Sequence, residues 1–297
     1  MGIVVETVQV SNDADTGSAI EHAVRAARAC VAEVGDAGIH TFINTGVYRD
    51  RNIVEPAVAA LIQKRAEIGL RYASDIEPVL SFDLMNGPCG FLGAVEVCDA
   101  ILRTRGSGRC LVVAGDGHPS TDPARSFPYA SSGAAAVLKH VAQQVGFGKV
   151  YGAATTGTFE PHGYVDLAEM GATGRETLSF GSVFDEDEVF KTAVRAAHDC
   201  LDAEHIDPAT TTLVTTQPVA DFGARVAAEL GFGLVVAAPA GYGRDPHTAA
   251  SLVAYAAATA DGPATDLLLL AAGAGPVAAA SVYRRPAARS TEQGDHR

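Results

Sequence analysis

The chain has 297 residues, 47% of them apolar, and its 35 acidic and 22 basic residues give a formal net charge of −13. A chain of this size buries a substantial core, either as one large domain or as two joined halves. The negative charge would repel a phosphate backbone, and no basic stripe with interleaved aromatic residues stands out. Nucleic acid is therefore not expected as a partner.

The sequence pattern also argues against a membrane-spanning, secreted, disulfide-linked or zinc-binding protein. No apolar run reaches the roughly 18 to 20 residues of a membrane span, and the opening MGIVVETVQV lacks the basic and apolar regions of a signal peptide. Five cysteines without a CxxC pair argue against a disulfide framework or a zinc site, and no metal site is expected. We therefore expect a soluble, cytoplasmic protein with reduced thiols and no membrane partner.

The first half alternates helical periodicity with short apolar runs. Ile20, Val24 and Ala27 recur at helical spacing and predict a helix over residues 15–34. The pattern then predicts a strand at 39–43, a helix at 55–65 with a proline in its first turn, a strand ending near residue 84, a helix at 89–103, and strands at 110–114 and 134–138. Such alternation is typical of a layered α/β architecture.

The second half repeats this order. It predicts helices at 185–203, 221–230 and 247–258, a strand at 212–216, and two strands in LLLLAAGAGPVAAASVYR. Both halves end with a strand, a Gly-rich turn and a small-residue strand, which indicates an internal duplication. The expected divisions are a first half at 1–150, an excursion at 151–181 that is a candidate substrate cap, a second half at 182–285, and a disordered tail at 286–297.

One stretch raises the question of chemistry. SFDLMNGPCGFLGAVEVCDAIL places Cys89 after a proline, where an apolar helix pattern begins, and it is followed in order by GAAAVL, DEDEVFKTAVRAAHDCLDAEHIDP and LLLLAAGAGP. These four segments resemble the thiolase superfamily, specifically ketoacyl synthase III-like enzymes, over residues 15–284. The resemblance implies a thiolase fold with duplicated αβαβα halves and a dimer. It also implies a cysteine that accepts an acyl group from a coenzyme A or acyl-carrier-protein thioester, without a tightly bound cofactor.

The sequence departs from this family at two positions. In the family a histidine and an asparagine drive decarboxylative condensation by donating to the enolate oxygen. Those positions fall at Thr216 and Pro246, with Gln217 and His247 beside them as partial substitutes. Losing one such donor costs about 3 to 4 kcal/mol of transition-state stabilisation. We therefore expect acyl transfer to an oxygen, nitrogen or carbon nucleophile, or to water, without decarboxylation.

A further departure concerns the substrate. The resemblance leads us to expect an N-terminal segment whose tryptophan and arginine hold the adenine end of coenzyme A. That segment is missing from the pattern, and the chain contains no tryptophan. Delivery by a carrier protein, or a weakly held thioester, becomes more plausible. The acidic charge offers no evident docking patch for an acidic carrier protein, although a partner chain could supply one.

Cys89 has two readings. At a helix start, backbone N–H groups hold an oxyanion and lower the pKa of a thiol, which suits an acyl-accepting nucleophile. The alternative is a small buried hydrophobe. The general base is predicted to be His247 by its position before a helix. His118 and Glu55 compete with it, and each of the three has an ordinary role as an exposed turn or helix-start residue. His162 would approach the site only if the excursion folds inward.

Five residues are candidates for substrate contacts. Tyr48 and Arg49 lie in NTGVYRDRN, which the resemblance places near the active site and the subunit interface; the alternative is a solvated turn. The Asn86 amide is suited to donate to a bound carbonyl. Gly273 and Gly275 would let the backbone pass close to the cysteine.

Three functions remain open. The preferred one is a thioester-dependent acyltransferase that forms an acyl-thioester on Cys89, in a fatty-acid-like, polyketide or secondary metabolic setting. The second is a decarboxylating ketoacyl synthase III in which neighbouring residues replace the missing donors. The third is a catalytically silent subunit that forms a heterodimer with a related ketosynthase.

Overall fold

The computed structural model describes residues 2–53, 55–70, 78–120, 127–155, 163–164, 179–180, 185–260, 266–273, 275 and 277–285. The predicted tail at 286–297 and His162 lie outside the described residues, as does most of the predicted excursion at 151–181.

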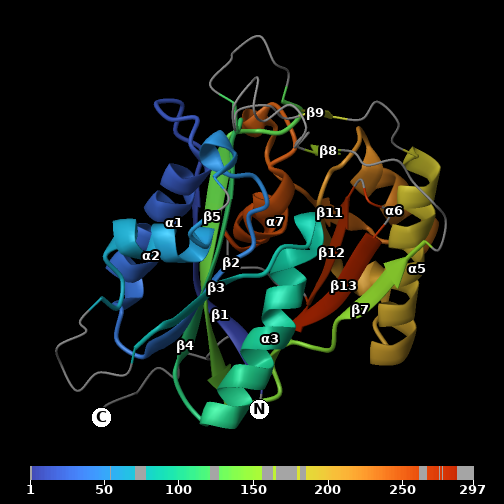
Figure 1. The fold of residues 1–297 in the computed structure, drawn as a ribbon. Helices are drawn as coiled ribbons and strands as arrows, with labels where there is room; N and C mark the ends of the chain where they lie inside the picture. The colour runs from blue at the N-terminus through green and yellow to red at the C-terminus, as the bar shows by residue number, and fades with distance from the viewer. Residues whose placement is uncertain are drawn as a thin grey trace, which may run out of the picture.

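One mixed sheet of 11 strands runs through the molecule in the order β11-β10-β12-β13-β6-β1-β5-β4-β2-β3, with β7 also paired to β13 (Figure 1). The strands are β1 (Gly2–Ser11), β2 (Ile39–Asn44), β3 (Leu80–Asp83), β4 (Arg109–Asp116), β5 (Ser132–Val141), β6 (Gly146–Phe147), β7 (Tyr151–Ala154), β10 (Thr212–Thr215), β11 (Leu234–Val236), β12 (Leu267–Gly273) and β13 (Val277–Arg284). A separate pair consists of β8 (Gly163–Tyr164) and β9 (Ser179–Phe180).

The two ends of the sheet have the same connectivity. In the first half β2 is parallel to β3 and β4, and β4 is antiparallel to β5. In the second half β10 is parallel to β11 and β12, and β12 is antiparallel to β13. This repeated order agrees with the duplication that the sequence indicates.

Helices lie on the outer faces of both halves of the sheet, and two more lie between the halves (Figure 1). They are α1 (Ala19–Val34), α2 (Val58–Ala66), α3 (Gly90–Arg105), α5 (Glu186–Glu204), α6 (Phe222–Leu230) and α7 (Ala250–Thr259), with 3₁₀ turns η1 (Asp50–Asn52), η2 (Gly87–Cys89), η4 (Pro208–Thr210), η5 (Ala240–Tyr242) and η6 (His247–Ala249).

Three apolar cores separate the layers. Helices α1 and α2 pack on one face of the first-half strands, and α5 and α6 pack on the corresponding face of the second-half strands. Helices α3 and α7 lie between the two halves in a core shared by β4, β5, β12 and β13. Along β4 and β12, alternate residues face the central and the outer core, as strand geometry requires. The result is an α/β fold with the five αβαβα layers that the sequence predicts.

Helix starts differ from the predicted boundaries by a few residues. Helix α1 begins after Ser18, whose hydroxyl accepts from the Glu21 N–H, rather than at residue 15. Helix α2 begins at Val58, so Pro56 precedes the helix instead of lying in its first turn. The predicted helix at 89–103 is a 3₁₀ turn over Gly87–Cys89 followed by α3 from Gly90. None of the helices within the described ranges is long and apolar enough to cross a membrane.

Candidate active site

Helix α3 begins at the centre of the molecule, where its first residues contact both the end of β12 and the turn η6. Pro88 and Cys89 are adjacent in η2, so their side chains point about 100 to 120° apart around the helix axis. Pro88 lines a cavity of about 600 Å³, together with His247, Gln217 and Gly273. The side chain that the helix start directs into this cavity is therefore a proline.

Cys89 faces away from that cavity and into the central core. Its side chain is 2% exposed, and its thiol donates weakly to the carbonyls of Ala271 at 3.5 Å and Val277 at 3.8 Å. Burial raises the pKa of the thiol to about 12. This geometry does not support an open, acidified thiol at the helix start, and the acyl-accepting role of Cys89 stays a prediction.

A second cavity of about 380 Å³ lies between α3 and strands β7 and β13. Cys89 contributes to its wall beside Asn86, and the rest of the wall consists mainly of small residues: Gly93, Gly152, Ala153, Ala154, Ala278 and Ala279. Asn86 is exposed, and its backbone carbonyl accepts from the Cys89 N–H at 3.1 Å. The predicted substrate contact of Asn86 therefore belongs to this second cavity.

His247 lies in the wall of the larger cavity with its ring fixed on two sides. Its Nδ1 is 3.1 Å from Oδ1 of Asp116, which is fully buried at the end of β4. Its ring stacks on Tyr129 with 4.0 Å between centroids. The second carboxylate oxygen of Asp116 accepts from the Thr248 hydroxyl and the Ala249 N–H, which holds the carboxylate in place.

The backbone at His247 adopts a strained conformation in the position that brings its ring to Asp116. Its φ of 48° is in the left-handed region, which costs a non-glycine residue free energy. The His247 N–H donates to Oδ1 of Asp245 at 3.0 Å, which offsets part of that cost. Nε2 points toward the start of α3, since a Cβ built on Gly87 would lie 3.9 Å from it. An imidazole whose Nδ1 is held by a carboxylate, in a residue that lines a cavity, is suited to act as a general base.

Asp245 is a second carboxylate in the wall of the same cavity. Burial raises its pKa to about 6, and the negative charge of Asp116 acts in the same direction. The site thus contains two carboxylates in different surroundings on either side of one histidine.

Thr216 is not available to replace the missing histidine. Its buried hydroxyl donates to the Ala272 carbonyl and accepts from the Ala272 N–H, each at 3.0 Å, so it joins β10 to β12. Gln217 does line the cavity, and its Oε1 accepts from the Gly223 N–H at 3.2 Å. This bond occupies the amide oxygen, so the NH₂ group is the part of Gln217 that remains a candidate donor.

The competing bases are not placed at the cavity. Glu55 is exposed and lies before α2. His118 accepts from the Ser120 N–H at 3.0 Å through Nδ1, and its ring lies near Phe127 with 5.4 Å between centroids. Neither belongs to the described wall of the larger cavity.

Of the two predicted substrate contacts in the segment after β2, Tyr48 lies beside His247 and Arg49 does not. The Tyr48 ring lies 5.3 Å from that of His247 and 5.6 Å from that of Tyr129, so it forms the layer behind the base. Arg49 instead pairs with Asp83 at 3.2 Å and donates to a loop carbonyl, which fixes the start of α2 rather than a substrate.

The glycine-rich turn after β12 approaches the start of α3. A Cβ on Gly273 would lie 2.8 Å from Cδ and Cγ of Pro88, so only glycine fits the contact as it stands. Gly273 thus approaches Pro88 rather than the sulfur of the predicted nucleophile. Gly275 lies in the turn between β12 and β13.

Three residues of the site were not among the sequence-based candidates: Asp116, Tyr129 and Asp245. Asp116 occupies a recognisable position, because it ends a buried strand at a Gly-rich loop, where functional residues are common. Tyr129 and Asp245 carry no such signal, since each lies in a loop that reaches the cavity only in the folded chain.

Comparison with known proteins identifies the fold. No family model and no curated protein sequence matches this chain. The 3-oxoacyl-(acyl carrier protein) synthase III of Pseudomonas aeruginosa superposes with a TM-score of 0.77 at 18% identity, covering 96% of this chain and 99% of its own. The priming beta-ketosynthase of a polyketide biosynthetic pathway gives 0.77 at 18% identity, covering 96% of each chain.

A third structure, OleA of Xanthomonas campestris with bound lauric acid and lauroyl-CoA, gives a TM-score of 0.69 at 17% identity and covers 91% of this chain and 84% of its own. At such identities a likeness establishes the fold rather than the reaction. These likenesses show that the chain has the thiolase-type fold that its four ordered segments predict.

Proposed function

We propose that this protein is a thioester-dependent acyltransferase in which His247 acts as the general base. It passes the acyl group of a coenzyme A or carrier-protein thioester to an oxygen or nitrogen acceptor, or to water, without decarboxylation. The observation that carries the proposal is the buried Asp116 carboxylate 3.1 Å from Nδ1 of His247, in the wall of the larger cavity.

The geometry supports a specific division of labour. Asp116 accepts a hydrogen bond from Nδ1–H, in a tautomer assigned from the hydrogen-bond network, so the lone pair is on Nε2 of a residue that lines the cavity. Nε2 takes the proton of the acceptor as its oxygen or nitrogen adds to the thioester carbonyl. The carbon–sulfur bond then breaks, and the departing thiolate takes the proton from Nε2. The Gln217 amide is the cavity group suited to donate to the transient oxyanion.

The structure favours direct transfer over an acyl-enzyme on Cys89. A covalent route would require the thiol, whose pKa burial raises to about 12, to lose its proton in the second cavity, whose described wall does not include His247. The predicted acyl-thioester therefore remains the alternative route.

Decarboxylative condensation is disfavoured for a related reason. The hydroxyl of Thr216 is committed to the Ala272 backbone, and Pro246 has neither a polar side chain nor an N–H. The two positions that would stabilise an enolate therefore offer no donor to the cavity.

A second candidate, a silent subunit in a heterodimer with a related ketosynthase, is favoured by one observation. Pro88, which cannot act as a nucleophile, occupies the helix-start position that faces the cavity. This candidate predicts that the chain alone releases no thiol from any acyl thioester.

The deciding experiment follows free thiol and carbon dioxide from acyl and malonyl thioesters of coenzyme A and of a carrier protein, with amine and alcohol acceptors. We expect thiol release without carbon dioxide. His247→Gln should lower the rate by about 10²- to 10⁴-fold, whereas Cys89→Ala should leave it unchanged and no acyl mass should appear on Cys89.

Other outcomes assign the function differently. Loss of activity in Cys89→Ala, with an acyl mass on that residue in the parent protein, would establish the covalent route. Carbon dioxide release would establish condensation. Inactivity of the parent chain alone, relieved by a related ketosynthase subunit, would establish the silent-subunit role.

A further inference from the structure

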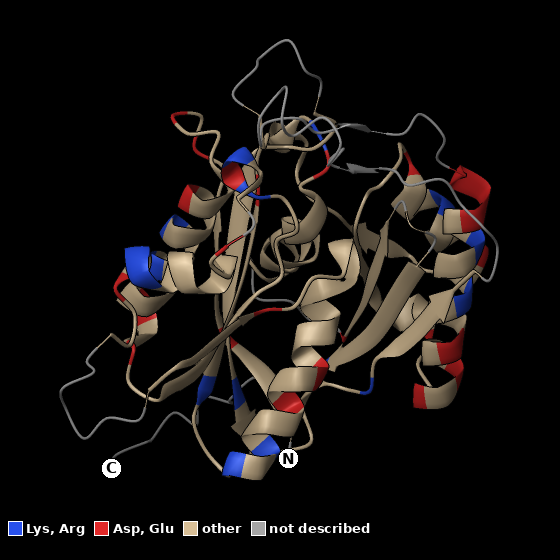
Figure 2. Cartoon of the chain, in the orientation of Figure 1, with Lys and Arg blue, Asp and Glu red and all other residues tan. Residues whose placement is uncertain are grey.

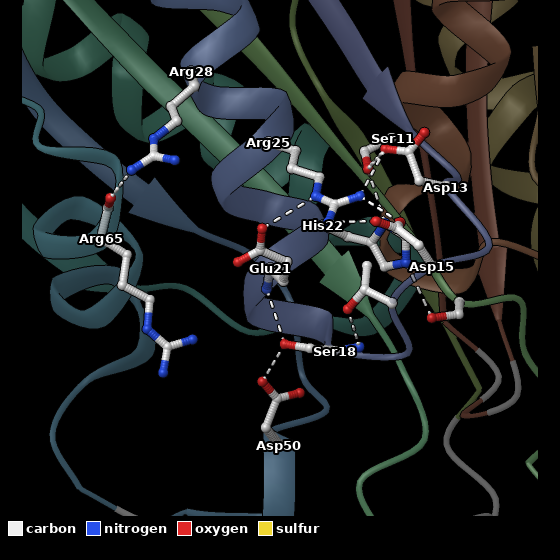
Figure 3. A network of polar contacts seen from close by, with 12 residues as sticks. Ser11, Asp13, Asp15, Ser18, Glu21, His22, Arg25, Arg28, Asp50 and Arg65 are labelled. Carbon is white, nitrogen blue, oxygen red and sulfur yellow. Dashed lines mark hydrogen bonds and ion pairs between the residues drawn. The ribbon is translucent and has the colours of Figure 1, made fainter.

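A second histidine is bonded to serines through both ring nitrogens (Figure 3). His22, in the first turn of α1, has no exposed surface. Its Nδ1 is 2.8 Å from the hydroxyl of Ser11, the last residue of β1. Its Nε2 is 3.1 Å from the hydroxyl of Ser131, which precedes β5 and is exposed. A buried base thus touches an accessible hydroxyl.

The ring is held rigidly by close packing. Gly133, two residues after Ser131, lies against the His22 backbone, where an added Cβ would be 2.7 Å from the His22 carbonyl carbon. Helix α1 therefore sits directly on β5 at this point. The orientation of the imidazole toward Ser131 follows from the fold and does not depend on a flexible side chain.

Asp13, on the far side of Ser11, bears on which ring nitrogen of His22 carries the proton. The Ser11 hydroxyl has a single hydrogen and two acceptors within reach, Nδ1 of His22 at 2.8 Å and Oδ2 of Asp13 at 3.4 Å. Asp13 also pairs with Arg25 at 3.1 Å. The inference rests on the tautomer in which this hydrogen goes to Asp13, so that the Ser11 oxygen accepts from Nδ1–H and Nε2 of His22 directs a lone pair at the Ser131 hydroxyl.

The electrostatic surroundings keep this ring neutral. Burial lowers the pKa of His22, and the positive charge of Arg25 lowers it further, against the opposing effects of a backbone hydrogen bond with Thr16 and of the charges of Asp13 and Asp15. A neutral imidazole with a free Nε2 is the form that accepts a proton from a serine.

We propose that Ser131 is a nucleophilic serine, activated by His22 through the chain Asp13–Ser11–His22, that takes an acyl group from an activated ester or thioester. The Ser131 oxygen adds to the carbonyl carbon while its proton passes to Nε2. The carbon–sulfur or carbon–oxygen bond breaks, and the leaving thiolate or alkoxide takes that proton. An ester remains on Ser131. This reactivity is separate from the His247 cavity and does not rest on the proposed function.

The first test uses a fluorophosphonate probe on the full-length protein, which forms an oxygen–phosphorus bond with activated serines and releases fluoride. Peptide mapping should locate the label on Ser131, and Ser131→Ala should remove it. Ser132, which is fully buried, serves as the neighbouring serine that should stay unlabelled. Absence of the label, or its persistence in Ser131→Ala, would overturn the inference.

Two variants in the chain Asp13–Ser11–His22 test whether Ser131 is labelled because His22 activates it or only because it is exposed. Asp13→Asn places an amide donor next to Ser11, so the hydroxyl hydrogen turns to Nδ1 and the proton of His22 moves to Nε2. Ser11→Ala removes the intermediate hydroxyl. Each should lower the labelling rate constant by at least about tenfold. Asp13→Asn, at an exposed residue, should leave the thermal midpoint unchanged, whereas Ser11→Ala removes a hydrogen-bond partner of the buried His22 ring and should lower the midpoint. A rate equal to that of the parent protein in both variants would refute the relay.

A spectroscopic measurement tests the tautomer without reference to reactivity. Long-range ¹H–¹⁵N correlation of His22 should show a proton on Nδ1 and none on Nε2, with the pattern reversed in Asp13→Asn. A proton on Nε2 in the parent protein, donated to Ser131 or to the Thr16 backbone that also bonds the ring, would overturn the inference. His247→Gln should leave both the label and the spectrum unchanged, which distinguishes this site from the cavity.

Discussion

At the residue scale, the two carboxylates beside His247 differ in how the fold has stabilised them. Asp116 is fully buried but accepts hydrogen bonds from His247, from the Thr248 hydroxyl and from the Ala249 N–H. Asp245 accepts the His247 N–H, and burial raises its pKa to about 6. The first carboxylate is suited to orient the base, whereas the second carries a desolvation cost whenever it is ionised.

Asp245→Asn should therefore change stability in a pH-dependent way. Because the folded-state pKa of about 6 lies above the unfolded value of 3.8, the native state binds more protons between these values, and the parent protein loses stability as pH rises through that window. The variant cannot ionise and still accepts the His247 N–H. Urea unfolding should show similar stabilities near pH 4 and a variant more stable by up to about 3 kcal/mol at pH 7.5. A pH-independent difference would contradict this account.

The cysteines lead to a second prediction at this scale. All five are buried, and burial raises the pKa of Cys30, Cys89 and Cys200 to about 12 each. A thiol-specific disulfide reagent at pH 8 should find no rapidly reacting thiol in the native protein and five after unfolding. One fast thiol that maps to Cys89 would show that this side chain leaves the core and would revive the covalent route.

At the scale of elements, the proposed function depends on the junction between β12 and the start of α3. The predicted helix at 89–103 is nearly correct in extent, but its first turn is a 3₁₀ turn that begins at Gly87. Each residue along such a turn rotates the side chain by about 100 to 120°. A cysteine and a proline that are neighbours in the sequence therefore face different cavities.

The same junction predicts a contrast between two glycines. Gly273→Ala should destabilise the protein by about 1 to 3 kcal/mol, because its methyl group would meet the rigid ring of Pro88 at 2.8 Å. Gly93→Ala, within α3 and with open space around it, should be neutral or stabilising by up to about 1 kcal/mol. Chemical denaturation of both variants provides the comparison, and equal effects would show that the contact has little energetic weight.

At the scale of the whole molecule, the sheet ends in two open edges, β3 and β11. Leu80 on β3 is 58% exposed and Met85 just beyond it is 51% exposed, while the buried Ser81 hydroxyl has no hydrogen-bond partner among the described residues. Many acidic side chains gather on the exposed face of α5, on the other side of the molecule (Figure 2). The β3 edge is thus the more suitable surface for a second subunit.

We accordingly expect the protein to form a dimer through β3. Leu80→Lys should shift the mass measured by light scattering toward the monomer, because it places a charge in an apolar interface. Leu234→Lys, which changes an equally exposed leucine on the opposite edge, is the matched control and should leave the mass unchanged. A monomeric parent protein that associates with a related ketosynthase chain would instead support a heterodimer.

The elements that could be predicted are those whose signal is local. The spacing of Ile20, Val24 and Ala27 predicted α1, and the repeated strand–turn–strand segments predicted the duplicated halves. Strand β1 was not predicted, although it joins the halves by pairing with β5 and β6. The alternation of apolar and polar residues in β1 indicates a strand only once its pairing partners are known, and these lie more than a hundred residues away.

The candidate site also has features that local sequence predicts and features that depend on long-range contacts. The order of residues along the chain was enough to select His247 and Gln217, which line the same cavity, and to indicate that the usual donors are missing, because those inferences depend on composition and register. The direction of the Cys89 sulfur, the carboxylate of Asp116 behind the imidazole and the stacking of Tyr129 were settled by packing. Desolvation and hydrogen bonding depend on neighbours that are distant in the chain, so no local pattern encodes them.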